Sequence, residues 1–234
     1  MNQTKTRTLW RRSTGDNPGL AWLFLSLLFF LLSYPLVADR PAGSLVLDVL
    51  FSAMLVISAY AVSAQRKILI VALVLALPTL GFWWSVRATD STSFAFTGLA
   101  LSAIFFLFIL FVLLRNVINS DEANIDTIYA AMSAYLLIGV TWSFFYAMVE
   151  ISTPGAFQFG SLAMQLQNSQ PHGELRLFSY YSLVTLSTLG YGDITPLTPL
   201  AQTLSALEAV TGQLFIAVLL ARLVGMHIAQ KQRN

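Results

Sequence analysis

The sequence predicts an all-α membrane protein with six transmembrane helices, from its composition and the length of its apolar runs. Of the 234 residues, 56 % are hydrophobic and 10 % are charged, and the mean hydropathy is +0.70. Soluble domains carry about 25 % charged residues, whereas a membrane-spanning helix needs about 20 mostly apolar residues. The six predicted spans are residues 19–37, 45–64, 68–86, 94–114, 128–149 and 199–225.

Composition also excludes several functional classes. The net charge of +2 comes from basic residues scattered between apolar runs, which is typical of membrane edges and not of a nucleic-acid surface. The absence of cysteine excludes disulfides, thiolate metal sites and a cysteine nucleophile. Neither a Ser/His/Asp constellation nor a phosphate-binding loop is present, so we expect no enzyme activity and no cofactor.

The distribution of lysine and arginine predicts that both termini are cytoplasmic, in a multi-pass protein of the cell membrane. With that orientation ten basic residues lie on the cytoplasmic side: Lys5, Arg7, Arg11, Arg12, Arg66, Lys67, Arg115, Arg222, Lys231 and Arg233. The outer side has Arg40, Arg87 and Arg176. The excess follows the positive-inside rule. We interpret residues 19–37 as a retained first span; the alternative is a cleaved signal peptide.

A polar break between the fourth and fifth runs divides the chain. The predicted parts are a cytoplasmic N-terminus (1–18), a four-helix voltage-sensor-like domain (19–116), a cytoplasmic linker (117–127), a pore domain (128–228) and a cytoplasmic tail (229–234). Asn119, with Glu122 three residues later, predicts a helix start in the linker. Thr198 followed by Pro199 predicts the start of the last helix, as an N-cap and a first-turn proline.

The stretch LVTLSTLGYGDITP, residues 183–196, is the most specific signal in the chain. Its first five residues end the apolar run 175–187, which is too short to cross a bilayer and predicts a re-entrant helix. Irregular backbone at membrane depth is tolerated where it is buried in protein or lines a water-filled path. Gly190 and Gly192 can adopt positive φ at little cost, which lets consecutive carbonyl groups point the same way.

Residues 175–228, with the filter-like sequence TLGYGD and both flanking helices, resemble the pore unit of the potassium-channel family, closest to its small bacterial members. In that family four such loops stack rings of carbonyl oxygens that replace the water shell of K⁺. One loop per chain implies a homotetramer in lipid, with K⁺ as the permeant ligand. Leu189 stands where the family has valine, and Tyr180 and Tyr181 stand where many members have paired tryptophans.

The resemblance implies roles for individual residues. The filter would be Thr188, Leu189, Gly190, Tyr191 and Gly192, with K⁺ held at the first four, Asp193 at the outer mouth, and Tyr180, Tyr181, Thr185 and Glu208 as filter support. Gly212 lies where the family commonly bends its inner helix. The alternative is that Gly212 is a close-packing residue, since small residues are common at helix contacts in membranes.

The resemblance extends to six-span voltage-gated channels, but the fourth run lacks their repeated arginines. A steep voltage switch needs roughly three or four gating charges per subunit, each contributing about 2.3 kcal/mol per 100 mV. Residues 94–114 contain none. We therefore expect a potassium-selective channel that conducts passively and is not steeply voltage-gated. The alternatives are a weakly selective cation channel and a non-conducting membrane sensor or regulatory subunit with a relic pore fold.

Overall fold

The computed structural model describes residues 18–37, 43–63, 65–89, 91–120, 124–160 and 173–231. Its helices are α1 (Pro18–Val37), α2 (Gly43–Ala61), α3 (Arg66–Thr89), α4 (Thr92–Asn119), α5 (Ile125–Ser152), α7 (Gly173–Leu186) and α8 (Pro199–Lys231). Two short strands, β1 (Phe157–Phe159) and β2 (Ile194–Pro196), pair antiparallel. Residues 1–17 and 232–234 of the predicted cytoplasmic ends lie outside the described residues.

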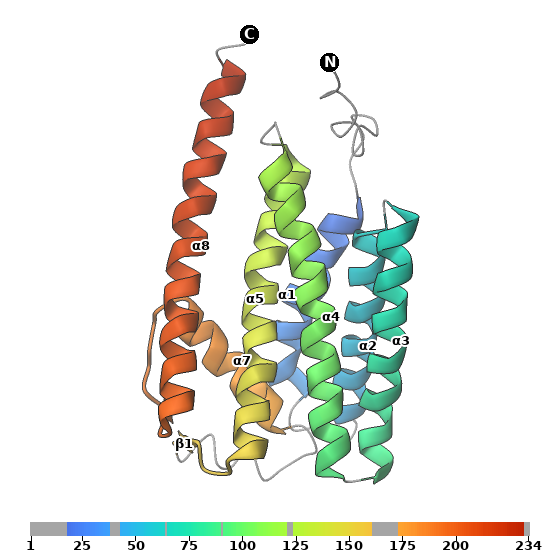
Figure 1. The fold of residues 1–234 in the computed structure, drawn as a ribbon, viewed down its shortest axis with the longest axis vertical. Helices are drawn as coiled ribbons and strands as arrows, with labels where there is room; N and C mark the ends of the chain where they lie inside the picture. The colour runs from blue at the N-terminus through green and yellow to red at the C-terminus, as the bar shows by residue number, and fades with distance from the viewer. Residues whose placement is uncertain are drawn as a thin grey trace, which may run out of the picture.

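In the described part of the chain, five helices are long and apolar enough to cross a membrane: α2, α3, α4, α5 and α8. The apolar part of α1, Pro18–Ser33, is shorter than these five. The prediction of several membrane spans is therefore confirmed for five of the six runs. The start of α1 and the end of α8 lie at the same end of the bundle (Figure 1).

The helices of the first part form a row of neighbours: α1 packs on α2, α2 on α3, and α3 on α4. The fifth helix, α5, packs on both α1 and α4, and it also contacts α7 and α8. Figure 1 shows α8 at one edge of the molecule, with α7 between it and α5. The short helix α7 does not run parallel to the long helices, as expected for a re-entrant element.

One aromatic cluster crosses the predicted boundary at residues 117–127. Phe51 of α2 stacks on Trp83 of α3 with ring centroids 4.0 Å apart, and it also contacts Phe106 of α4 and Phe144 of α5. Asp48 of α2 is buried and accepts a hydrogen bond from the Trp83 indole at 2.9 Å. Since Phe144 belongs to α5, the first four helices and α5 share a single core.

The prediction that a helix starts at Asn119 is wrong. Asn119 is the last residue of α4, because the apolar pattern of that helix continues past Arg115 through Val117 and Ile118. The N-cap of α5 is Asn124, whose side chain accepts from the amide of Thr127 at 2.9 Å. An N-cap of this kind satisfies one of the free amides of the first turn.

The start of the last helix is predicted correctly. Helix α8 begins at Pro199, and the Thr198 hydroxyl accepts from the amide of Ala201 at 3.3 Å. The helix is continuous to Lys231, and only 11 % of its apolar span is buried, against 61 % for α5. Helix α8 therefore leaves an apolar surface that a single chain does not cover.

Candidate functional site

In the segment between α7 and β2, every second residue from Thr188 to Gly192 has a positive φ angle. Thr188, Gly190 and Gly192 have φ angles of +60°, +59° and +77°. The positive φ predicted for the two glycines is therefore observed. A residue with positive φ at every second position turns successive peptide groups to one side of the chain, whereas an extended strand alternates them.

Thr188 also ends helix α7. Its amide donates to the carbonyl of Thr185 and the amide of Leu189 donates to the carbonyl of Val184, both at 2.9 Å. This pair of bonds is the Schellman motif, in which the left-handed position is usually glycine. The left-handed conformation costs a residue with a side chain about 1–2 kcal/mol. A positive φ at threonine was not predicted; the signal was its place directly after the apolar run 175–187.

Helix α8 approaches the end of α7 very closely at Gly212. A Cβ atom added there would lie 2.1 Å from the Leu186 carbonyl oxygen, so no other residue fits without movement. This close approach fits the close-packing interpretation of Gly212. The next residue, Gln213, donates from its side-chain amide to the Thr188 hydroxyl at 3.1 Å.

Glu208 joins three helices behind the loop. Its side chain on α8 is fully buried, and its carboxyl group is hydrogen-bonded to the hydroxyls of Tyr146 on α5 and Ser182 on α7. The Ser182 hydroxyl also lies 2.7 Å from the carbonyl oxygen of Gly139 on α5. Because the carboxyl group has partners on both sides, it holds α7 between α5 and α8. Tyr146 was not predicted; an isolated tyrosine in an apolar span gives no positional signal.

The two predicted tyrosines of α7 have different partners. Tyr180 donates to the carboxylate of Asp193, just after the loop, at 2.8 Å. Burial and the Asp193 carboxylate raise the pKa of the Tyr180 hydroxyl to about 12, so it remains a donor at neutral pH. The Tyr181 hydroxyl lies 2.7 Å from that of Ser205 on α8. Together they attach α7 to the exit of the loop and to α8.

The exit of the loop is fixed from the C-terminal end of α5. Glu150 accepts from the amides of Gly155 and Phe157 at 2.7 and 3.0 Å, which shapes the turn into β1. Strand β1 pairs with β2, and the amide of Gly160 donates to the carbonyl of Asp193 at 2.8 Å. Neither Glu150 nor the strand pair was predicted, because runs of three residues are too short to show alternation.

The loop, residues 188–192, is itself open in a single chain. Leu189 is 60 % exposed and Tyr191 is 67 % exposed. Single exposed apolar side chains are common, whereas a large exposed apolar patch marks a surface for another protein or for the membrane. The exposure of Leu189 and Tyr191, beside the uncovered face of α8, indicates that other chains or lipid complete this region.

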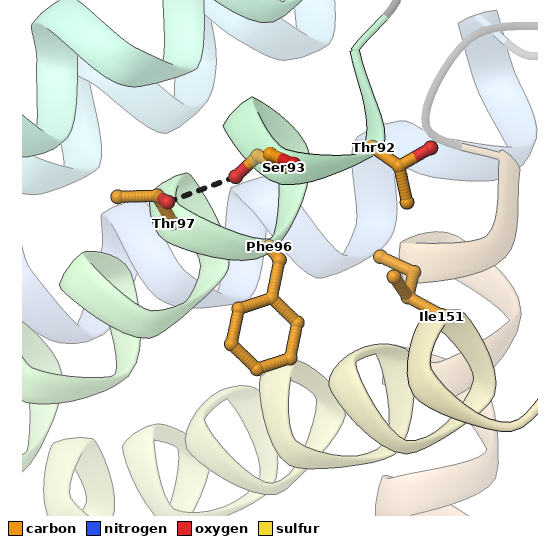
Figure 2. Close-up of a pocket in the computed structure, with 5 residues that line it drawn as sticks. All are labelled: Thr92, Ser93, Phe96, Thr97 and Ile151. Carbon is orange, nitrogen blue, oxygen red and sulfur yellow. Dashed lines mark hydrogen bonds between the residues drawn. The ribbon is translucent and has the colours of Figure 1, made fainter.

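A separate pocket opens between the start of α4 and the end of α5. Figure 2 shows its lining residues, Thr92, Ser93, Phe96, Thr97 and Ile151, with the Thr97 hydroxyl donating to the carbonyl of Ser93 at 2.8 Å. These side chains are hydroxyls, an aromatic ring and an aliphatic group. None of the five is charged, so the pocket does not have the chemistry of a metal site.

Comparison with known proteins identifies the segment around the loop. Residues 172–228 match the family described as ion channel, a family of channels and not of enzymes. The inward rectifier potassium channel Kirbac3.1 of Paramagnetospirillum magnetotacticum is 32 % identical over 115 residues, which are 44 % of this chain and 39 % of that protein. Two pore potassium channel c of Oryza sativa subsp. japonica is 37 % identical over 91 residues, 39 % of this chain and 17 % of that protein.

These relatives share the pore segment and not the whole chain. The chain spans less than two fifths of the length of either relative. A third, Two-pore potassium channel 4 of Arabidopsis thaliana, is 44 % identical over 55 residues, 24 % of this chain and 19 % of that protein. No solved structure matches. The predicted resemblance is thus confirmed for the ion-channel pore segment, which α7, the loop and α8 make up.

Proposed function

We propose that four copies of this chain form a potassium-selective channel that conducts K⁺ passively across the cell membrane and is not steeply voltage-gated. The observation that carries the proposal is the alternation of positive φ at Thr188, Gly190 and Gly192, at the C-terminal end of a re-entrant helix. Four such loops around an axis would present rings of carbonyl oxygens, as in potassium filters. The three relatives, which are potassium channels by name, support the same ligand.

The fourfold assembly follows from the ligand count. One loop supplies one oxygen per ring, and a dehydrated K⁺ needs a closed ring, so the site is complete only with partner chains. The exposed Leu189 and Tyr191, and the uncovered face of α8, leave room for those partners. The negative end of the α7 dipole lies at Thr188, where it would favour a cation.

Two further features support the orientation and the weak voltage dependence. The start of α1 and the end of α8 lie at one end of the bundle, in keeping with two cytoplasmic termini (Figure 1). Between Thr92 and Leu114, α4 contains no lysine or arginine. A segment without charged side chains gains no energy from the membrane field, so voltage would not move it.

Flux from liposomes tests the proposal. The full chain, reconstituted with a K⁺ gradient, is expected to set a potential close to the Nernst value for K⁺ and to discriminate against Na⁺ in bi-ionic reversal potentials. Gly190→Ala is the inactive control, since φ of +59° strains any residue with a Cβ. A permeability ratio near one would favour the weakly selective alternative, for which Leu189 is the structural reason. No flux from the wild-type chain at any voltage would favour the non-conducting sensor.

A further inference from the structure

The filter loop has a side-chain hydrogen bond to the inner helix that the backbone mechanism does not require. The amide nitrogen of Gln213 lies 3.1 Å from Oγ1 of Thr188. Gln213 belongs to α8 and Thr188 to the loop, 25 positions earlier in the chain. The contact therefore depends on how α8 packs against the base of the loop.

Gly212 explains why Gln213 reaches this place. The α8 backbone comes so close to the Leu186 carbonyl that only glycine fits at position 212. Glycine inside a helix costs about 1 kcal/mol relative to alanine. The neighbouring side chain is thereby brought to the end of α7, where Thr188 stands.

Thr188 is the residue of the loop that most needs support. It is β-branched and has a φ of +60°, a combination that occurs rarely. Its hydroxyl oxygen has two lone pairs and one proton. An amide proton donated by Gln213 occupies one lone pair and fixes the direction of the oxygen, which leaves the other lone pair for a ligand.

We propose that Gln213 is a positioning residue for the innermost ion site, holding Oγ1 of Thr188 in the orientation that coordinates a dehydrated K⁺. The inference rests on the proposed function, because it takes Thr188 as an ion ligand. It goes further by assigning the affinity of that site to a side chain of the inner helix. In a tetramer the same bond recurs four times around the axis.

The test measures K⁺ binding apart from conduction. The thermal unfolding midpoint of the full chain in detergent is recorded while K⁺ replaces Na⁺ at constant ionic strength, because a ligand of the folded state raises the midpoint. Gln213→Leu keeps the side-chain size and removes the bond. It is expected to raise the K⁺ concentration for half-maximal stabilisation at least about three- to tenfold, which is the effect of one neutral hydrogen bond, and by more if the four bonds lost around the axis add. The midpoint in Na⁺ alone is expected to stay near the wild-type value.

Gln202→Leu is the matched control. It removes the same amide at the outer end of α8, where the Gln202 side chain donates to the carbonyl of Pro196 at 3.3 Å. Its K⁺ dependence is expected to match the wild type. A double-mutant cycle isolates the pair: in a Thr188→Val background, Gln213→Leu is expected to have no further effect on K⁺ dependence.

The outcomes separate the inference from its premise. Equal K⁺ dependence in Gln213→Leu and Gln202→Leu, or additive effects of the Thr188 and Gln213 changes, would overturn the role of Gln213 while leaving the filter intact. A wild-type chain that K⁺ stabilises no more than Na⁺ does would overturn the proposed filter, and the inference with it.

Discussion

Replacing Gly212 with alanine tests how closely α8 must pack against the end of α7, just before the loop. The new Cβ would lie 2.1 Å from the carbonyl oxygen of Leu186 and 3.0 Å from its carbonyl carbon. Carbon–oxygen contacts settle at about 3.3–3.6 Å, so α7 and α8 must separate by more than about 1 Å. Both neighbours are backbone atoms in helices, and neither can rotate away as a flexible side chain would.

The expected cost is that of overpacking, about 1–3 kcal/mol per chain, reduced by the gain of about 1 kcal/mol when alanine replaces glycine in a helix. The functional effect is expected to be larger than the loss of stability. Thr188 follows directly on α7 and moves with its end. A binding group must be held within about 0.5 Å of its productive position. We therefore expect Gly212→Ala to lower the unfolding midpoint and to abolish selective K⁺ flux.

Gly225→Ala is the matched control on the same helix. A Cβ at Gly225 meets nothing within 4 Å, so the substitution is expected to raise stability by about 0.4–1 kcal/mol through chain entropy alone. The measurements are thermal unfolding in detergent and K⁺ flux from liposomes. If Gly212→Ala were as stable as Gly225→Ala and changed only the open probability, the hinge interpretation would be correct and the packing argument refuted.

Three other substitutions test the frame around the loop. Arg222→Gln removes the guanidinium that donates to the carbonyls of Val117 and Ile118 in the last turn of α4 and to that of the following Ser120. We expect faster amide exchange at the end of α8, partly restored by Arg222→Lys, and unchanged exchange in α7. Glu150→Gln replaces one of the two acceptor oxygens by an NH₂ group, so one of the amides of Gly155 and Phe157 loses its acceptor. We expect a loss of roughly 1–3 kcal/mol in the free energy of unfolding, measured by thermal unfolding. An unchanged midpoint would show that the turn does not need the carboxylate. Glu208→Leu leaves the buried Tyr146 hydroxyl without its carboxyl partner, whereas the Ser182 hydroxyl keeps the Gly139 carbonyl, so it is expected to destabilise the chain by roughly 1–3 kcal/mol, and Glu208→Gln by less.

Run length and turn chemistry explain what the sequence could predict. The thickness of the hydrocarbon layer sets a minimum length for a spanning helix, so the long apolar runs locate α2 to α5 and α8 without knowledge of packing. Thr198 and Pro199 mark a helix start locally. Gly190 and Gly192 predict positive φ because only glycine adopts it without steric cost. Each of these signals is contained in a few adjacent residues.

The remaining features depend on contacts between distant residues. The α4 carbonyls that Arg222 binds lie about a hundred positions earlier in the chain, and no periodicity in nearly uniform apolar helices reveals that register. Thr188 has positive φ because it both closes the C-terminal end of α7 and begins the loop. These two constraints override the preference of threonine for negative φ. Asn119 was mistaken for a helix start because Asn119 and Asn124 both suit an N-cap, and only the extent of α4 decides between them.

The packing of α4 bears on what the first four helices do. Phe106 of α4 stacks on Phe144 of α5 with centroids 5.8 Å apart, and both are buried. A movement of α4 along α5 would have to break this stack, and α4 contains no lysine or arginine between Thr92 and Leu114 on which a membrane field could act. Because Arg222 binds the end of α4, a displacement of α4 would be transmitted to α8 directly. The aromatic stack and the Arg222 contact therefore attach α4 to both α5 and α8.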